Sequence, residues 1–376
     1  MEKKDNFEVI IIGCGIAGAS CAYFLAEKGI TDILMIEREE QPGYHSTGRS
    51  AAVIVEFEPI PTVQDLIVKS AKFFRNPPEG FCENPLLEQS GILLMFQSQL
   101  WKFAEQSAMR LESSGVKFKL LSPSEVASMM PVISPEYLDG AMYLSEDGHI
   151  DVHELFWSYI RHSKRRGVEL RCNVEVKGIN VERDKCTGVV TNKGKFKAKW
   201  VVNAAGAWAG KIGKLANTAP IKLVPYRRTI ISFSPPGDID ASGWPHAVNP
   251  SYGLYFSPES GGICASPMDE DPMEPCDAYP DELVIAQTVD RIGKLAPPLV
   301  PRSLRRKWAG LRTFAQDYAF VVGEDPLTKR FFWLAGQGGS GIETSPLVGQ
   351  IAADLIAEGR TELFNSGLLS PARFLG

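Results

Sequence analysis

The sequence predicts an α/β protein of α+β organisation, in which the chain leaves a parallel-sheet domain and later re-enters it. Near the N-terminus, "FEVIII" (7–12), a glycine-rich turn and an apolar helical repeat precede a second apolar run, "DILMIE" (32–37). Continuous β-branched runs are typical of strands that are buried on both faces of a parallel sheet. Gly29 is expected to end the intervening helix, which makes this segment a βαβ unit.

The middle and the end of the chain predict the rest of this organisation. Short apolar runs separated by Pro-, Gly- and Asp-rich turns indicate an inserted, mostly antiparallel sheet; they lie at 90–96, 226–233, 252–258 and 261–267. Residues 151–167, with Asp151 as helix N-cap, residues 199–209 and residues 330–359 return to strand-and-helix patterns. We therefore assign a first domain to residues 1–80, 145–220 and 310–376, and a second to residues 81–144 and 221–309.

Composition excludes several classes of protein. The 376 residues are 44% hydrophobic and 23% charged, with a net charge of -5 at pH 7, which gives no bias toward nucleic acid. No run approaches the ~20 apolar residues of a membrane span. The seven cysteines have no C-x-x-C or Cys/His spacing, so we expect no metal site and reduced thiols in a cytoplasmic protein. Peripheral membrane attachment is expected only if a quinone accepts the electrons.

The turn after the first strand carries a dinucleotide-binding pattern. Gly13, Gly15 and Gly18 form G-x-G-x-x-G between a buried strand and a helix, where backbone N–H groups attract a pyrophosphate. Glu37 ends the second strand, where a carboxylate accepts hydrogen bonds from an adenosine ribose and repels a 2′-phosphate. This context predicts a Rossmann-like domain that binds FAD or NAD rather than NADP.

Two further segments favour FAD over NAD. The stretch "REEQPGYHSTGRSAA" (38–52) is rich in small and hydroxylic residues, which suits a loop beneath a flavin. A second glycine loop, "GQGGSGIETS" (336–345), precedes the last helix and is expected to direct amides toward the N1–C2=O edge of a reduced flavin. The alternative is that these glycines make an ordinary turn.

Several stretches, in order along the chain, resemble the D-amino-acid oxidase superfamily of FAD-dependent oxidoreductases. Besides the first glycine motif, they are "PGYHSTGRSAA" (42–52), "VVNAAGAWA" (201–209), "WAGLRTF" (308–314) and "FFWLAGQGGSGIETS" (331–345). Within the superfamily the chain most resembles the bacterial D-arginine dehydrogenases, on "FFRNPPEGFCENPLL" (73–87) and "LLSPARFL" (368–375). The resemblance covers nearly the whole chain. It implies non-covalent FAD, because no cysteine or histidine matches a position of covalent attachment.

The resemblance also implies cofactor contacts. Glu37 and Arg38 are expected to bind the adenosine, Val176 to lie along the adenine, and residues 338–342 to cover the pyrimidine edge of the flavin. The full implied set is Gly13, Gly15, Ile16, Ala17, Gly18, Glu37, Arg38, Ser46, Thr47, Arg49, Ser50, Ala51, Ala52, Val176, Ala205, Gly206, Gly338, Gly339, Gly341 and Ile342.

On the substrate side, the resemblance matches Arg228 and Arg312 to a guanidinium clamp on a substrate carboxylate, and Tyr255 to a hydroxyl at the same site. A planar guanidinium suits a carboxylate, since it forms two parallel charge-assisted bonds. For each arginine the alternative is a structural ion pair. The expected pocket walls are Val53, Glu58, Ile92, His246 and Val248.

The implied reaction is oxidative deamination of a D-amino acid. A hydride passes from the α-carbon to flavin N5, and water hydrolyses the imino acid to a 2-oxo acid and ammonia. Val53 and Ile92 stand where D-arginine dehydrogenases have polar residues, which favours a neutral or hydrophobic side chain; Glu58 is an alternative acid for a cationic one. The other functions left open are a glycine, sarcosine or secondary-amine oxidase, including the catalytic subunit of a multi-component dehydrogenase, and a flavin-binding protein without turnover.

Overall fold

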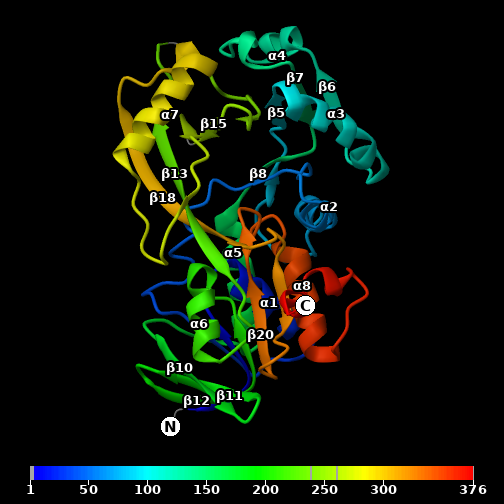
Figure 1. Cartoon of the computed structure of the whole chain (residues 1–376), viewed down its shortest axis with the longest axis vertical. Helices are drawn as coiled ribbons and strands as arrows, with labels where there is room; N and C mark the ends of the chain where they lie inside the picture. Colours follow the sequence, from blue (N-terminus) through cyan, green and yellow to red (C-terminus); the bar gives the residue numbers. More distant parts are fainter. Residues whose placement is uncertain (1–3, 238, 260, 376) are drawn as a thin grey trace.

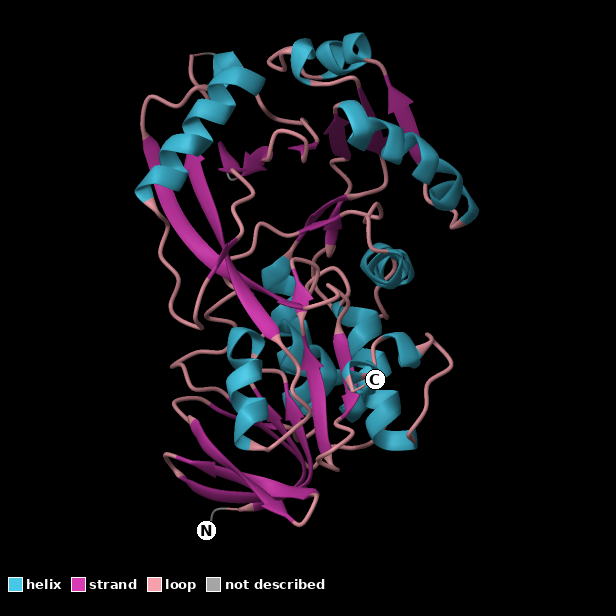
Figure 2. Cartoon of the chain, viewed as in Figure 1, coloured by secondary structure: helices cyan, strands magenta, loops and turns pink. Residues whose placement is uncertain are grey.

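Two large sheets lie at opposite ends of the long axis of the molecule (Figure 1). The computed structural model describes residues 4–237, 239–259 and 261–375. An eight-stranded sheet with its helices forms the lower half, and a ten-stranded sheet forms the upper half (Figure 2). This mixed α/β architecture, with a parallel sheet and an inserted, mostly antiparallel one, confirms the predicted fold class.

The eight-stranded sheet has the order β10-β11-β12-β1-β2-β9, with β20 beside β12 and β19 beside β20. Its strands are β1 (Asn6–Ile12), β2 (Ile33–Ile36), β9 (Glu169–Arg171), β10 (Val176–Glu182), β11 (Lys185–Thr191), β12 (Gly194–Asn203), β19 (Val321–Glu324) and β20 (Phe331–Ala335). The central pairings, β12–β1, β1–β2, β2–β9 and β12–β20, are parallel. Every residue of β2 and β20 is buried, as both faces of a parallel sheet are covered.

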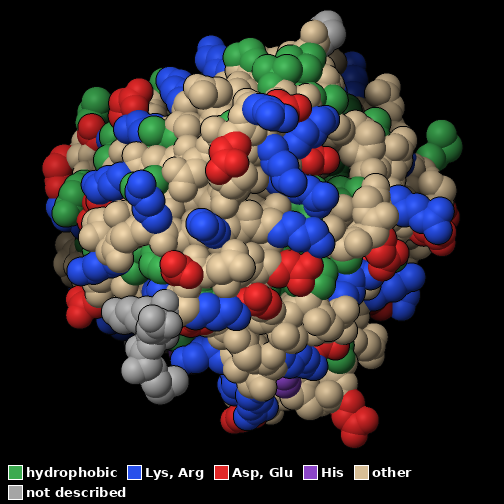
Figure 3. Space-filling model, turned by 90° about the horizontal axis from the view of Figure 1, so that it is seen from below, with side chains coloured by type: hydrophobic (Ala, Val, Ile, Leu, Met, Phe, Trp, Pro, Cys, Tyr) green, Lys and Arg blue, Asp and Glu red, His purple; other side chains and the backbone are tan. Residues whose placement is uncertain are grey.

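Helices cover both faces of this sheet. One face packs on α1 (Ile16–Glu27), α2 (Pro61–Arg75), α5 (Val152–Arg165) and α8 (Ser345–Glu358), and the other on α6 (Ala209–Leu215). Asp151 caps α5 by accepting a hydrogen bond from the Glu154 N–H at 2.8 Å, as predicted. At the lower end (Figure 3), basic and acidic side chains are interspersed, and the outward-facing Lys199 pairs with Glu8 at 3.3 Å.

The ten-stranded sheet is antiparallel except where β14 pairs with β5. Its strands are β5 (Ile92–Phe96), β6 (Phe118–Leu121), β7 (Gly140–Leu144), β13 (Leu223–Phe233), β14 (His246–Asn249), β15 (Leu254–Glu259), β16 (Gly262–Ser266), β17 (Asp271–Pro272), β18 (Leu304–Ala315) and β21 (Gln337–Gly338). One face packs on α4 (Pro123–Met129) and α7 (Glu282–Leu295); α3 (Ser98–Ser113) packs on the other face at the β5–β7 end.

Smaller elements join the two halves. A three-stranded sheet is formed by β3 (Val53–Ile54), β8 (Gly148–Ile150) and β4 (Leu87–Glu88), and single 3-10 turns lie at η1 (Pro135–Tyr137), η2 (Gly206–Trp208), η3 (Pro297–Leu299), η4 (Ser366–Leu368) and η5 (Pro371–Phe374). The division into two domains stays a prediction. β18 runs across the expected boundary at 310, and β21, from the segment assigned to the first domain, pairs with β18.

No helix within the described ranges is both long and apolar enough to cross a membrane.

The turn between β1 and α1 is tight enough to require glycine at two positions. Gly13 has φ +97, and a Cβ on Gly18 would lie 2.1 Å from the Gly13 carbonyl oxygen. The first turn of α1 therefore packs directly on the end of β1, and this close approach points the helix N-terminus at the carboxyl end of the sheet.

We expect Gly18→Ala to reduce the yield of cofactor-loaded protein and to destabilise the fold by about 1–3 kcal/mol, because the added methyl group overlaps backbone. Gly210→Ala in α6 is the matched control, since its Cβ would lie 3.8 Å from the nearest atom, Leu223 Cβ. Thermal unfolding and flavin absorbance measure both variants. Equal melting temperatures for the two would contradict this account of Gly18.

Candidate functional site

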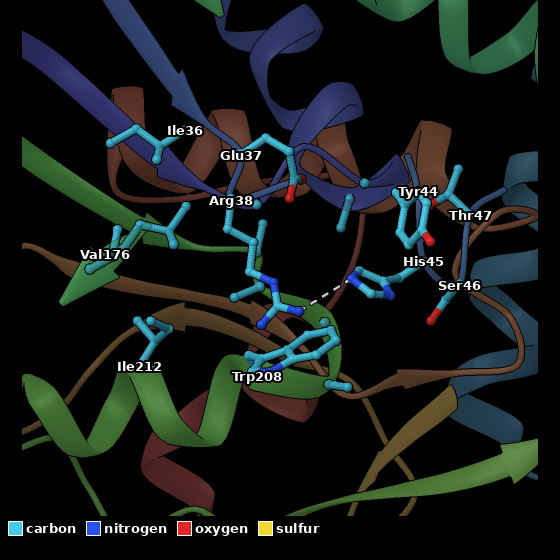
Figure 4. Close-up of a pocket in the computed structure, with 18 of the residues that line it drawn as sticks. Ile36, Glu37, Arg38, Tyr44, His45, Ser46, Thr47, Val176, Trp208 and Ile212 are labelled. Carbon is cyan, nitrogen blue, oxygen red and sulfur yellow. Dashed lines mark hydrogen bonds between the residues drawn. The ribbon is translucent and has the colours of Figure 1, made fainter. Parts of the chain in front are cut away.

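A cavity of about 280 Å³ opens at the carboxyl ends of β1, β2 and β12 (Figure 4). Ligands of open parallel sheets bind at this edge. The walls of the cavity are formed by the glycine turn, the end of β2, the loop that follows β2, the start of β10, and α6. The apolar lining residues are Ile12, Ile36, Val174, Val176, Ala204, Ala205, Ile212 and Leu215. An apolar pocket with one polar end fits the adenosine of a dinucleotide.

Glu37 supplies the acidic end of this cavity. Its carboxylate is buried and accepts one hydrogen bond from the Cys14 N–H and one from the Glu39 N–H, both at 3.0 Å. Each oxygen has a second lone pair, because a carboxylate offers about four acceptor sites. Glu37 is thus held in place by backbone donors and retains acceptors for two ribose hydroxyls.

Arg38 crosses the cavity to a tryptophan. Its guanidinium carbon lies 3.8 Å from the centre of the Trp208 ring (Figure 4). Its Nε donates to Glu39 at 2.7 Å. His45 packs on the same ring at 4.6 Å and bonds Glu39 at 2.8 Å. The resemblance pointed to Arg38 but not to Trp208 or His45. The only sequence signal for Trp208 is its place after the second glycine turn, "AAGAW".

The cavity brings together about half of the predicted cofactor contacts. Those that line it are Gly13, Gly15, Ile16, Ala17, Glu37, Arg38, Ser46, Thr47, Val176, Ala205 and Gly206. The remaining predicted contacts lie outside it: Gly18, Arg49, Ser50, Ala51, Ala52, Gly338, Gly339, Gly341 and Ile342. Gly18 packs on the turn itself, and Ile342 belongs to the core beside α1.

The loop 43–52 is bonded to both halves of the molecule. Thr47 Oγ1 accepts the Ile16 N–H at 3.0 Å, which satisfies one free donor of the α1 N-terminus. Ser46 Oγ donates to the Leu311 carbonyl at 2.7 Å. Arg49 donates to the carbonyls of Ala278 and Ala309 and pairs with Asp277, which ties the loop to the segments that hold these three residues.

The second glycine loop lies against the substrate-side arginine. A Cβ on Gly339 would be 3.0 Å from the guanidinium carbon of Arg312, and one on Gly338 would be 2.2 Å from the Phe314 ring. Gly338 also pairs with Thr313 in the short β21–β18 ladder. The loop is therefore fixed to β18 by backbone and by close packing.

Strand register brings the three predicted catalytic side chains to one face of the ten-stranded sheet. Arg228 on β13 is opposite Gly310 on β18, and Arg312 lies two residues further along β18. Alternate residues of a strand share a face, so both arginines project from the same side. The registers of β16 with β13 and of β15 with β16 carry Tyr255 to that side as well.

Three of the predicted pocket residues share this face. Val248 is opposite Tyr255, and His246, two residues earlier on β14, is opposite Ile92 on β5. The opposite face of these strands packs on α7 and α4. The side chain of Trp308, on the same face as Arg312, donates to the Arg49 carbonyl at 3.0 Å, so this face is turned toward the loop 43–52.

The two arginines differ in their partners. Arg228 is 4% exposed; its Nε donates to the Asp269 carbonyl at 3.0 Å and its Nη2 to Glu270 at 2.8 Å. Its Nη1 is buried and has no hydrogen-bond partner among the described residues. Burial, with the nearby charge of Arg312, lowers the pKa of Arg228 to about 10. Arg312 has no carboxylate within 4.0 Å among residues 4–237, 239–259 and 261–375. Arg312 can therefore accept an anionic ligand without first breaking an ion pair within the described residues.

Aromatic and imidazole rings line the sheet beside the arginines. Tyr255 is buried, which raises the pKa of its phenol, and its ring centre is 5.2 Å from that of His246. Burial, with His149 and Arg312 nearby, lowers the pKa of His246 to about 3, so the ring is neutral at pH 7. His149 was not singled out from the sequence. Its ring centre lies 5.9 Å from that of His246, and its Nδ1 forms a hydrogen bond with Ser90 Oγ at 2.9 Å.

The remaining predicted pocket residues fall in two environments. Ile92 is fully buried in an apolar cluster with Phe57, against which Val53 and Val248 pack. Glu58 is half-buried; burial raises the pKa of its carboxyl, and Arg312 and Arg110 oppose that shift. Both predicted alternatives for the substrate side chain therefore remain open: an apolar wall that suits a neutral side chain, and Glu58 as an acidic partner for a cationic one.

Glu343 is a buried acid that sequence reasoning missed. It lies at the end of the second glycine loop, is 8% exposed, and accepts a hydrogen bond from the Val55 N–H at 2.9 Å. Burial raises the pKa of its carboxyl to about 8, with Glu58 adding to the shift. The sequence signal that could have indicated Glu343 is an acidic residue between a glycine loop and an apolar helix.

Within the described ranges, no group of three or more His, Cys, Asp or Glu side chains forms a metal site.

Comparisons with known proteins agree with this geometry. The family described as "DAO: FAD dependent oxidoreductase" matches residues 8–355. The mouse mitochondrial pyruvate dehydrogenase phosphatase regulatory subunit is 25% identical over 94% of this chain, which spans only 41% of that protein. Sarcosine oxidase subunit beta of Rhizobium meliloti (strain 1021) is 25% identical over 95% of this chain and 86% of the relative.

A solved structure shares the whole fold. L-proline dehydrogenase from P. horikoshii superposes with a TM-score of 0.88 at 26% identity, covering 99% of this chain and 98% of that one. The family match and the cavity identify the dinucleotide as FAD, and the glycine turn, Glu37 and the apolar walls fit its adenosine half.

We expect purified protein to carry FAD that acid or heat releases intact. His45 is the histidine that lines the cavity, and it lies against Trp208 and Glu39 at the end suited to adenosine, away from the expected flavin ring. Absorbance of the supernatant after denaturation, with chromatography of the released flavin, makes the measurement. Flavin in the protein pellet would contradict non-covalent binding, and FMN in the supernatant would contradict the dinucleotide site.

Proposed function

This chain belongs to the DAO family of FAD-dependent oxidoreductases, and on that basis we propose that it oxidises the bond between the α-carbon and the nitrogen of an amino acid. The observation that carries the proposal is Arg312, a half-buried guanidinium that has no ion-pair partner among the described residues and lies against the second glycine loop. A carboxylate bound there sits beside the segment that the family resemblance assigns to the flavin.

The residues on the arginine-bearing face of the ten-stranded sheet have different roles in binding the substrate. Arg312 binds the carboxylate, and Arg228 contributes its unpartnered Nη1 and a second positive charge. Tyr255 supplies a hydroxyl that stays protonated, because burial raises its pKa. When bound, FAD supplies the two-electron acceptor. The protein contributes mainly position, since the clamp fixes the α-hydrogen and the buried surroundings exclude water.

For the substrate, we propose a neutral or hydrophobic D-amino acid. Ile92 is fully buried in an apolar cluster with Val53 packed against it, so a cationic tail placed there loses water without gaining a partner. Such a loss costs about 1–3 kcal/mol. The product is an imino acid, which water hydrolyses to a 2-oxo acid and ammonia.

A second candidate substrate is a secondary amine. Two of the similar proteins, sarcosine oxidase subunit beta and L-proline dehydrogenase, are named for amino acids whose nitrogen carries a second carbon. The same clamp serves both candidates, because the carboxylate and α-carbon are common to them. The proposals therefore differ only in the group on nitrogen and in the configuration at the α-carbon.

We expect Arg312→Ala to lower kcat/KM by roughly 10- to 100-fold, the loss of one charge-assisted bond of about 1.5–3 kcal/mol. Arg228→Ala should act in the same direction, and flavin content should survive in both. Arg306→Ala is the control, an exposed arginine on the same strand. Near-normal kcat/KM in either clamp variant, with flavin intact, would make that arginine structural.

Anaerobic mixing with an amino-acid panel decides the substrate. We expect D-leucine, D-methionine and D-phenylalanine to bleach the flavin faster than D-arginine, and Ile92→Glu to gain preference for D-arginine. Bleaching by sarcosine or L-proline alone would favour the secondary-amine candidate. A wild type that prefers D-arginine, and loses the preference in Glu58→Gln, would transfer side-chain recognition to Glu58. No bleaching by any member would favour a flavin-binding protein without turnover.

A further inference from the structure

A buried carboxyl group lies where the two loops of the site meet. Glu343 is on the segment between β21 and α8, 8% exposed, and its Oε2 accepts the Val55 N–H at 2.9 Å from the segment that follows β3. Burying an acid is costly, and one backbone bond leaves most of its acceptor capacity unused. A purely structural role, limited to this one hydrogen bond, would offset little of the free energy that burying the carboxylate costs.

The two charged groups that act on Glu343, Arg312 and Glu58, come from other parts of the chain. Arg312 on β18 lies against the same loop, with its guanidinium carbon 3.0 Å from a Cβ built on Gly339. Glu58, on the segment between β3 and α2, is the second acid; Arg110 of α3 donates to its backbone carbonyl at 3.0 Å. The loop therefore carries one carboxyl group and packs against a guanidinium from β18 whose charge acts on that carboxyl group.

An amino acid carries the complementary pair of groups on one carbon atom. Its nitrogen is two bonds from its carboxylate carbon, so a carboxylate bound by Arg312 would bring the nitrogen close to the loop against which Arg312 packs. Before a hydride can leave the α-carbon, the ammonium must lose a proton so that the nitrogen lone pair can form the imine. The loop holds an acceptor for that proton next to the carboxylate clamp.

We propose that Glu343 accepts the proton that the substrate ammonium releases, an assignment that rests on the proposed oxidation of an amino acid. The N–H bond breaks, its electron pair stays on nitrogen, and an O–H bond forms on the Glu343 carboxylate. The two electrons and the α-hydrogen then go to the bound flavin, and the proton on Glu343 passes to solvent after the product leaves.

Electrostatics suit Glu343 to this exchange. Burial, and the like charge of Glu58, raise the pKa of its carboxyl to about 8, while the Val55 N–H, Ser340 and Arg312 oppose the shift. An ordinary carboxylate is too weak a base to take a proton from an ammonium group at neutral pH. A base whose pKa is near the operating pH combines adequate strength with an adequate ionised fraction.

The first test needs no substrate and is therefore independent of the proposed function. Infrared difference spectra of the holoenzyme between about pH 6.5 and about pH 9.5 should include the signal of a buried carboxylic acid that loses its proton. The signal should be absent in Glu343→Gln, whose amide oxygen can still accept the Val55 N–H. Glu58→Gln is the control and should retain the signal at a lower pH, because the like charge is gone. Loss of the signal in Glu58→Gln but not in Glu343→Gln would overturn the assignment.

The second test measures the reaction itself. Flavin bleaching is followed anaerobically against pH, with whichever panel amino acid bleaches the wild type. At about pH 8, Glu343→Gln should be slower by at least ~10-fold, and the gap should close as pH approaches the amine's own pKa. Glu343→Asp, which keeps an acid, should recover part of the rate. A constant ratio of wild type to Glu343→Gln across the pH range would overturn the proposal. If nothing bleaches the wild type, the proposed function fails while the infrared result for Glu343 stands.

Discussion

The attachment of one loop to both halves of the molecule determines where the site lies. Loop 43–52 contacts the dinucleotide turn through Thr47, which accepts the Ile16 N–H at 3.0 Å. It contacts the ten-stranded sheet through Ser46 on the Leu311 carbonyl at 2.7 Å and through Trp308 on the Arg49 carbonyl at 3.0 Å. The arginine-bearing face of the upper sheet is consequently held over the carboxyl edge of the lower one.

The arginine-bearing face of the ten-stranded sheet has an excess of positive charge that the neighbouring protein groups do not neutralise. Two arginines near each other are unfavourable, and burial with this repulsion already lowers the pKa of Arg228 to about 10. Arg228 has Glu270 as a partner, whereas Arg312 has none within 4.0 Å in the described part of the chain. The two neighbouring acids do not neutralise Arg312 fully, since burial raises the pKa of both Glu58 and Glu343. In the proposed reaction, a substrate carboxylate supplies the missing negative charge.

Local patterns were enough to predict the dinucleotide turn, because Gly13, Gly18 and Glu37 act within one βαβ unit. The substrate side could be named only through the family resemblance, since its assembly depends on long-range register, including the parallel β14–β5 pairing. Glu343 escaped notice for a similar reason. Its carboxylate is buried only in the folded chain, and the N–H group that donates a hydrogen bond to it belongs to Val55, 288 positions away in the sequence. Arg49 stays a predicted cofactor contact, and no local pattern reveals that its guanidinium pairs with Asp277 and donates to two carbonyls.

The second glycine loop couples cofactor and substrate recognition. Gly338 and Gly339 pack so closely on Phe314 and Arg312 that any side chain there displaces one of them. Glu343 follows four residues after Gly339, so the loop that is expected to face the flavin carries the buried acid and packs against the Arg312 guanidinium, which comes from β18. In the proposed reaction, a shift that opens this loop for the cofactor therefore changes the distance between Glu343 and Arg312. A substrate whose carboxylate and nitrogen share one carbon atom fits this pair of groups only while the loop stays packed on Phe314 and Arg312.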